Sequence, residues 1–259
     1  MRDFLTWLRS ALYMLGWAAN TVLCAAGCML ALPLPYKVRY GVISYWCWFA
    51  LRWLELTCGL KGRVIGRENL PRDAAVVMSK HQSAYETMAL QRLLPLTAWV
   101  VKRELLWIPF FGWGLWSLRP IALNRSNRAE AGRQLIEQGK ARLRDGAWIV
   151  IFPEGTRIAA GRRGKYKQGG ARLACGTGAP VVPVAVNSGE YWPRNSFLKY
   201  PGEIVVSIGP AIPTVGKTAD QVNREVSAWI EAEMARISGV GPCWPAGRQP
   251  AEVHGTVSA

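Results

Sequence analysis

Histidine is the scarcest residue with acid–base chemistry in this 259-residue chain, which contains only His81 and His254. His254 lies in a C-terminal segment rich in glycine, proline and alanine. Imidazole has an ordinary pKa close to neutral pH and is therefore the most frequent proton acceptor in catalysis. Any histidine chemistry in this protein has to use His81.

The chain also lacks several motifs that define metal, nucleophile and nucleic-acid sites. It has no H-E-x-x-H zinc motif, no G-x-S-x-G nucleophile motif and no C-x-x-C pair among its six cysteines. We therefore expect no metal site, no bound cofactor and no disulfide framework. Because it has no basic recognition helix, zinc finger or RNA-binding motif either, nucleic acid is not an expected partner.

Acidic residues are few. The chain has 17 aspartates and glutamates against 32 lysines and arginines, which gives a formal net charge of +15. A charge of this size favours anionic partners such as anionic membranes or phosphorylated substrates. The chain also contains 13 tryptophans, and tryptophan is enriched where lipid meets water. The composition therefore predicts an anionic lipid membrane as a partner.

Charge is absent altogether between Arg9 and Lys37. A helix of about 23 residues is roughly 34 Å long, enough to cross a bilayer core of about 30 Å. The next apolar run, 40–51, is too short to cross unaided. Residues 1–60 are thus predicted to form a membrane-associated helical hairpin that dips into one leaflet. A single span by the first helix is the alternative.

Basic residues precede, separate and follow these two apolar runs. Basic loops tend to stay on the cytoplasmic side of a membrane. We therefore expect the rest of the chain to lie on the cytoplasmic face of the inner membrane in either arrangement.

Residues 61–240 alternate short apolar runs with helical patterns. This alternation predicts an α/β domain with a mixed, mostly parallel sheet flanked by helices. Asn127 is expected to cap a helix that stops at Gly146, and a capping box is expected at Thr218. Residues 241–259 are expected to be a disordered tail. The predicted strands are 74–78, 97–101, 119–123, 148–152, 181–186 and 204–208.

The segment 76–86, VVMSKHQSAYE, places His81 directly after an apolar run typical of a buried strand, and Glu86 follows five positions later. On one continuous helix the two side chains would point about 140° apart. They can meet only if His81 lies in a loop and Glu86 in the first turns of the next helix. The carboxylate would then orient the imidazole for removing a proton from a substrate hydroxyl. A chance pair on a surface loop is the alternative.

A second motif is FPEGTR at 152–157, after another predicted strand. Gly155 permits close approach of a ligand to the backbone, and Thr156 and Arg157 supply hydrogen-bond donors suited to phosphate. Glu154 can hold a polar acceptor or brace neighbouring cations. An ordinary turn at the end of a strand would also account for this motif.

Three further features carry basic residues. Arg125 follows a predicted strand, and Lys102 precedes an aromatic-rich segment, 107–113, which suits an acyl-chain groove, the membrane interface or ordinary core packing. No acidic residue occurs between Glu154 and Glu190. The basic stretch in this interval is either a solvated loop or a surface that binds anionic lipid or substrate phosphates. The basic residues of that run are Arg162, Arg163, Lys165, Lys167 and Arg172.

In this order and spacing, the blocks from Ser79 to the Val182-Pro183-Val184 segment resemble the glycerolipid acyltransferases, specifically the bacterial type of 1-acyl-glycerol-3-phosphate acyltransferase. The specific feature is an H-x4-acid motif followed about 70 residues later by FPEGTR. The resemblance covers most of the predicted α/β domain. Many members of this family also carry an N-terminal two-helix unit that dips into the membrane.

The resemblance implies an enzyme that moves a fatty acyl group from acyl-CoA or acyl carrier protein to the sn-2 hydroxyl of lysophosphatidic acid, giving phosphatidic acid. His81 would be the general base and Glu86 the acid that orients it. The acceptor's phosphate and glycerol would be bound by Lys102, Arg125, Glu154, Gly155, Thr156 and Arg157.

The chain departs from the family pattern at three positions. Glu86 stands where aspartate is usual and reaches one methylene further. Lys80 replaces an asparagine and adds a positive charge beside the imidazole unless it points away, and Asn124 replaces an aspartate. The reaction type is expected to hold, whereas another lysophospholipid, a lyso-ornithine lipid or glycerol 3-phosphate stays open as the acceptor. Outside acyl transfer, the residues are also compatible with a lipid hydrolase or with a catalytically silent membrane-binding protein.

Overall fold

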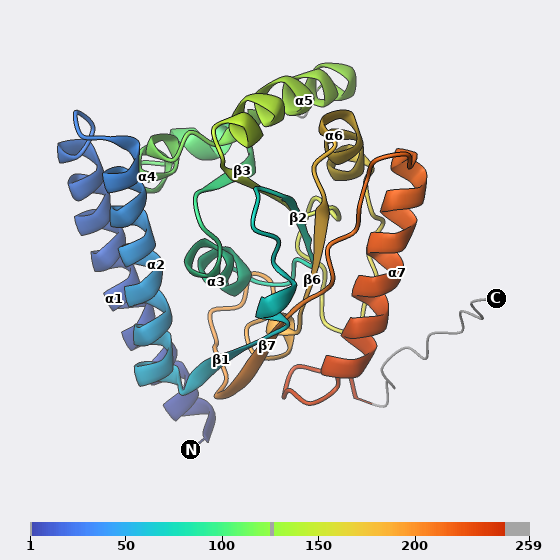
Figure 1. Cartoon of the computed structure of the whole chain (residues 1–259). Coiled ribbons are helices and arrows are strands. Elements are labelled where there is room, and N and C mark those ends of the chain that lie inside the picture. The colour runs from blue at the N-terminus through green and yellow to red at the C-terminus, as the bar shows by residue number, and fades with distance from the viewer. Residues whose placement is uncertain (1, 125–126, 247–259) are drawn as a thin grey trace.

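The computed structural model describes residues 2–124 and 127–246 and is built around one seven-stranded sheet (Figure 1). The strand order is β1-β7-β6-β2-β5-β3-β4. All neighbouring strands are parallel except β6 and β7, which are antiparallel. The predicted mixed, mostly parallel sheet is therefore confirmed. The strands are β1 (Leu60–Ile65), β2 (Val76–Ser79), β3 (Thr97–Lys102), β4 (Ile121–Leu123), β5 (Trp148–Ile151), β6 (Val181–Val186) and β7 (Gly202–Ile208).

Helices cover both faces of the sheet (Figure 1). Successive strand residues point to opposite faces, so Val77 packs with the helices of one face and Met78 with those of the other. Burial on both faces explains why these strands are continuous apolar runs. The helices are α1 (Arg2–Leu30), α2 (Tyr36–Cys58), α3 (Tyr85–Leu93), α4 (Phe111–Ser117), α5 (Arg128–Arg144), α6 (Gly169–Thr177) and α7 (Ala219–Ile237), with short 3-10 turns η1 (Arg67–Asn69), η2 (Arg103–Trp107) and η3 (Ser188–Glu190).

The central strand β2 lies between β5 and β6 and is parallel to both. The strands β3 and β4 run in the same direction on the far side of β5. The carboxyl ends of all five strands therefore meet at one edge of the sheet, which is where ligands bind in open α/β folds. The segments that follow β2, β3, β4, β5 and β6 are brought together at this edge.

The N-terminal helices α1 and α2 form a hairpin that packs on the α/β domain (Figure 1). Tyr13 of α1 and Leu54 of α2 are fully buried in the same core as Val184 of β6. The outer face of the hairpin is apolar, with Leu23 72% exposed and Leu30 81% exposed. Among the described residues, α1 is the one helix long and apolar enough to cross a membrane. These features indicate membrane association.

The predicted helix signals are confirmed. Asn127 caps α5 by accepting hydrogen bonds from two backbone N–H groups, and α5 ends at Arg144, two residues before Gly146. Thr218 and Gln221 form the predicted capping box of α7. The predicted tail 241–259 lies largely outside the described residues, because residues 247–259 are not described.

Two strand predictions need correction. The strand predicted at 119–123 begins only at Ile121, because Arg119 has a φ of 51° and cannot continue an extended strand. The edge strand β1 was not predicted. Its side chains after Leu60 are mostly exposed, so Leu60–Ile65 has no apolar pattern to reveal it.

Candidate active site

The segment after β2 carries His81 and leads into α3. β2 ends at Ser79, and α3 begins at Tyr85. His81 therefore lies in the loop and Glu86 in the first turn of the helix. This is the arrangement that the five-residue spacing required.

His81 and Glu86 face each other. Nδ1 of His81 lies 2.8 Å from Oε1 of Glu86. Glu86 is completely buried, whereas the side chain of His81 is 14% exposed. Because the carboxylate engages Nδ1, Nε2 is the ring nitrogen available to take a proton.

The carboxylate of Glu86 is fixed by a dense set of donors. Oε1 accepts hydrogen bonds from the backbone N–H groups of Gln82 (2.5 Å) and Ser83 (2.8 Å), and Oε2 accepts from the hydroxyls of Ser83 (3.0 Å) and Ser188 (2.7 Å). Burial alone raises the pKa of this carboxyl group. The hydrogen bonds from His81, Ser188 and Ser83 outweigh burial and lower the pKa of Glu86. Glu86 is therefore a carboxylate at neutral pH.

The imidazole of His81 is also held from one face. Its ring stacks on the ring of Phe152, with centroids 3.8 Å apart and an angle of 8° between the planes. The carbonyl of His81 accepts a hydrogen bond from the backbone N–H of Ile158 at 2.8 Å. The FPEGTR segment and Ile158, the residue after it, thus support the side chain and the backbone of the histidine.

Glu154 lies in this segment and makes its contacts within the protein. Oε1 accepts hydrogen bonds from Nζ of Lys80 (2.8 Å) and the backbone N–H of Gly164 (3.2 Å). Oε2 accepts a hydrogen bond from the backbone N–H of His81 at 3.2 Å. Glu154 therefore braces a neighbouring cation, one of the two roles that the sequence left open.

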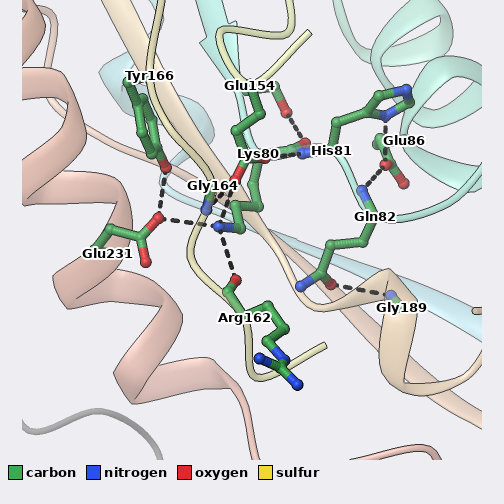
Figure 2. Close-up of polar contacts among 11 residues, drawn as sticks. Lys80, His81, Gln82, Glu86, Glu154, Arg162, Gly164, Tyr166, Gly189 and Glu231 are labelled. Atoms are coloured by element: carbon green, nitrogen blue, oxygen red, sulfur yellow. Dashed lines mark hydrogen bonds and ion pairs between the residues drawn. The ribbon is translucent and has the colours of Figure 1, made fainter. Parts of the chain in front are cut away.

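Lys80 points away from the imidazole. Figure 2 shows its side chain running to the opposite side of the loop from His81, toward Glu154 and Glu231. Nζ lies 2.9 Å from Oε1 of Glu231, and the hydroxyl of Tyr166 donates a hydrogen bond to the same oxygen at 2.7 Å. The ammonium therefore belongs to a buried ionic network behind the active site.

The turn after β5 presents three of the predicted substrate-binding residues. Gly155 has a φ of 69°, which glycine adopts without strain, and a Cβ there would lie 2.6 Å from Nζ of Lys167. Thr156 is exposed and Arg157 is partly exposed. The turn therefore presents the donor groups of Thr156 and Arg157 at the surface next to the His81 loop.

Of the remaining predicted residues, Lys102 lies at the same edge of the sheet. Lys102 ends β3, has a half-exposed side chain, and lies 3.5 Å from the carboxylate of Glu104. Arg125 lies outside the described residues. The structure thus brings His81, Glu86 and Glu154 into direct contact and places Lys102, Gly155, Thr156 and Arg157 at the same edge.

The sequence did not reveal three residues that hold the pair in place. Phe152 stands out only as part of a motif, Gln82 carries no signal of its own, and Ser188 is 102 residues from the carboxylate it contacts. Gln82 accepts a hydrogen bond from the backbone N–H of Gly189 at 3.0 Å, which ties the His81 loop to the segment after β6. No local pattern could have paired these segments, because only the sheet brings them together.

Comparisons with known proteins agree with this geometry. The model of a family described as Acyltransferase matches residues 61–187. A 1-acyl-sn-glycerol-3-phosphate acyltransferase of Pseudomonas aeruginosa is 44% identical over 211 residues, which are 80% of this chain and 82% of the relative. The human 1-acyl-sn-glycerol-3-phosphate acyltransferase alpha is 29% identical over 63% of this chain and 59% of the relative.

A solved structure has the same fold. The crystal structure of the 1-acyl-sn-glycerophosphate (LPA) acyltransferase PlsC from Thermotoga maritima matches with a TM-score of 0.77, covering 92% of this chain and 100% of that chain at 22% identity. This likeness includes the region of the N-terminal hairpin. The solved structure shows that the fold is shared. The 44% identity to the Pseudomonas aeruginosa protein over four fifths of both chains shows that the chain belongs to the 1-acyl-sn-glycerol-3-phosphate acyltransferase family, as the resemblance predicted.

Proposed function

We propose that this protein transfers a fatty acyl group from an acyl thioester to the free hydroxyl of 1-acyl-glycerol-3-phosphate, forming phosphatidic acid. The observation that carries the proposal is the contact between His81 and the buried carboxylate of Glu86 at the carboxyl edge of the sheet. Membership of the family supports the acceptor and the product.

His81 acts as the general base in this proposal. Nε2 takes the proton of the acceptor hydroxyl as its oxygen attacks the thioester carbonyl. The carbon–sulfur bond then breaks, and the thiolate leaves with the proton returned by the imidazolium. Glu86 stabilises the imidazolium through Nδ1. Base catalysis of this kind contributes about 10²–10⁴-fold to the rate.

The basic residues at the sheet edge bind the acceptor's phosphate. Arg157 and Lys102 supply positive charge, Thr156 supplies a hydroxyl, and Gly155 lets the phosphate approach the backbone. Arg125 is assigned to the same phosphate-binding group because of the family resemblance of its sequence motif. Holding the acceptor in line with Nε2 supplies the positioning part of catalysis.

Glu154 takes a positioning role rather than a direct contact with substrate. Both of its carboxylate oxygens are already engaged by Lys80, Gly164 and His81. It fixes the backbone of His81 and the loop after the FPEGTR motif. The imidazole is therefore held toward the acceptor by a rigid loop.

The hairpin supports a place at the inner membrane, with the active site on the cytoplasmic face. Two exposed tryptophans outside the hairpin add to the apolar surface: Trp107 of η2 is 75% exposed and Trp116 of α4 is 57% exposed. Dipping into one leaflet fits a hairpin whose inner face is packed on the α/β domain. The acyl donor is acyl-CoA or acyl carrier protein, both of which carry phosphate that the basic run 162–172 can attract.

The test uses purified full-length protein and a panel of acceptors with both donors. The acceptors are 1-acyl-glycerol-3-phosphate, glycerol 3-phosphate, a lysophosphatidylcholine and a lyso-ornithine lipid, and mass spectrometry identifies the products. We expect phosphatidic acid as the main product. His81→Ala should abolish its formation, and His254→Ala, which removes the other histidine, should not. Equal release of free fatty acid without any acceptor would indicate a hydrolase instead.

A further inference from the structure

A second basic pocket lies away from the active site, between α4, the start of α2 and the end of α5. Figure 1 shows α4 between the turn of the α1–α2 hairpin and α5. The pocket has a volume of about 530 Å³, within the range of small-ligand sites. Its lining residues are Arg39, Leu106, Trp116, Arg119, Pro120 and Arg142.

The three arginines of this pocket are gathered around Tyr36. The guanidinium groups of Arg39 and Arg119 lie 5.7 Å and 5.3 Å from the centre of the Tyr36 ring. Nε of Arg142 donates a hydrogen bond to the carbonyl of Arg119 at 2.9 Å. Burial raises the pKa of the Tyr36 hydroxyl, and the positive charges of Arg142, Arg119 and Arg39 oppose that effect. Three cations therefore converge on one small space.

The charge in this pocket is poorly compensated within the described part of the chain. The carboxylate paired with the cluster is that of Asp145, 3.9 Å from Arg142. Nε of Arg39 is buried and has no hydrogen-bond partner among the described residues. A buried donor without an acceptor is costly, so the site is suited to an anion that accepts from it. Arginine groups in this number favour phosphate, which accepts two parallel hydrogen bonds from a guanidinium.

An apolar groove adjoins the pocket. It has a volume of about 370 Å³ and shares Leu106 and Trp116 with the basic pocket. Its other lining residues are Met29, Arg103, Trp107 and Trp113. A cationic pocket that opens onto a tryptophan-lined groove matches a molecule with a phosphate and a hydrocarbon chain.

The three arginines of the pocket lie apart from His81 and Glu86. Arg119 precedes β4 and Arg142 precedes β5, so both lie at the amino edge of the sheet, and the hydroxyl of Tyr40, next to Arg39, bonds to Thr97 at the amino end of β3. His81 follows the carboxyl end of β2. A six-residue strand such as β3 is roughly 20 Å long, which sets the scale of the distance between the arginines and His81. The groove extends from the arginines toward Arg103, the residue after Lys102 at the carboxyl end of β3.

We propose that this pocket binds the phosphate of an anionic membrane phospholipid, whose acyl chain lies in the adjacent groove. Bound lipid would join α2, α4 and α5 at the turn of the hairpin, beside its exposed apolar face. The site would recognise a lipid that is neither acceptor nor product at the catalytic edge.

The test uses full-length protein in a zwitterionic detergent, with thermal unfolding followed by tryptophan fluorescence. Dihexanoyl phosphatidylglycerol should raise Tm by roughly 3 °C at ten times its Kd. Dihexanoyl phosphatidylcholine and inorganic phosphate at the same concentrations should give little or no rise. The rise should persist in saturating 1-acyl-glycerol-3-phosphate, because that acceptor occupies the other edge.

Arg39→Gln and Arg142→Gln should each weaken phosphatidylglycerol binding by at least about tenfold, since each removes a charge-assisted hydrogen bond. Arg144→Gln is the matched control: it makes the same charge change on the same helix, at an exposed position outside the pocket. All three variants should keep acyl transfer in detergent without anionic lipid, so failure here is distinguishable from failure of the proposed function.

Three results would overturn the proposal. Unchanged phosphatidylglycerol binding in both Arg39→Gln and Arg142→Gln would remove the pocket as its site. An equal effect of phosphatidylcholine would show that the anion is irrelevant. Equal protection by inorganic phosphate would identify a free-phosphate site and exclude the lipid assignment. Circular dichroism of each variant confirms that its fold is retained.

Discussion

The ammonium group of Lys80 lies 2.8 Å from the carboxylate of Glu154, and both side chains are buried. The same ammonium group lies 2.9 Å from Glu231 of α7 (Figure 2). Since Glu154 also accepts a hydrogen bond from the backbone of His81, the ion pair connects α7 to the loop that carries the proposed general base. Lys80, which stands where the family usually has asparagine, therefore stabilises the His81 loop from the side opposite the imidazole.

Removing that lysine should destabilise the protein. Lys80→Met leaves Glu154 and Glu231 without their shared cation, and such a change at a buried pair costs about 3–5 kcal/mol. Thermal and chemical unfolding measure this loss. Lys140→Met, which removes an exposed lysine from α5, should change stability by less than about 0.5 kcal/mol.

A second variant tests whether the loss comes from the unpaired charges. Lys80→Met combined with Glu154→Gln and Glu231→Gln should recover part of the lost stability, because neutral amides are cheaper to bury than carboxylates. A Lys80→Met protein as stable as the wild type would contradict the network. So would a triple variant less stable than Lys80→Met alone.

The length of Glu86 should matter as much as its charge. Its two oxygens contact His81 and the donors of Gln82, Ser83 and Ser188 at once. Glu86→Asp withdraws the carboxylate by one methylene and should lower kcat about tenfold, even though aspartate is the usual residue in the family. Glu86→Gln removes the charge that stabilises the imidazolium and should lower kcat about 10²–10⁴-fold. Steady-state kinetics with the preferred donor measure both, and a fully active Glu86→Asp protein would argue against a tightly fitted carboxylate.

Ser188 should contribute by holding Glu86 rather than by touching substrate. Ser188→Ala removes the 2.7 Å hydrogen bond to the buried carboxylate, which costs about 1–3 kcal/mol. The pKa of Glu86 should then rise. On acidification, Ser188→Ala should therefore begin to lose stability at a higher pH than the wild-type protein does. The sign follows because a carboxyl group with a lowered folded pKa stabilises the protein above its unfolded pKa and loses that effect on acidification. Unfolding measured from pH 7 to pH 3 checks this, with an unchanged KM for the acceptor expected.

Arg157 should act on binding of the acceptor. Arg157→Gln removes one charged contact to the phosphate and should raise KM for 1-acyl-glycerol-3-phosphate about 10–100-fold, with a smaller effect on kcat. Arg224→Gln makes the same charge change at an exposed position on α7 and serves as the control. A fall in kcat at constant KM would mean that Arg157 does not bind the acceptor in its ground state.

Lys199 should make stability depend on pH above neutrality. Its side chain is buried among Tyr13, Trp192 and Phe197, and burial lowers its pKa from 10.5 to about 8. Between these values the unfolded chain holds a proton that the folded chain has lost, so this lysine's contribution to stability rises with pH. The free energy of unfolding of Lys199→Met, relative to wild type, should therefore fall by up to about 3 kcal/mol between pH 8 and pH 10. A difference that is constant across that range would contradict the lowered pKa.

The sequence by itself determined the parts that are local. Spacing alone required His81 in a loop and Glu86 at a helix start, and both lie there. The helix caps at Asn127 and Thr218 could also be predicted, because each side chain bonds to backbone groups only two or three residues further along the chain. The continuous apolar strands follow from burial on both faces, and two specific motifs were enough to predict the family.

Only the tertiary structure decided the parts that depend on distant contacts. Sheet order brings Ser188 to Glu86 and Glu231 to Lys80, across 102 and 151 residues of chain. The same order gathers Arg39, Arg119 and Arg142 at the opposite edge, although no motif connects them. Sequence periodicity records which face a residue buries, but it carries no information about which strands become neighbours. For that reason the contact between His81 and Glu86 could be predicted from the chain, whereas the groups that hold this pair and the second basic pocket could not.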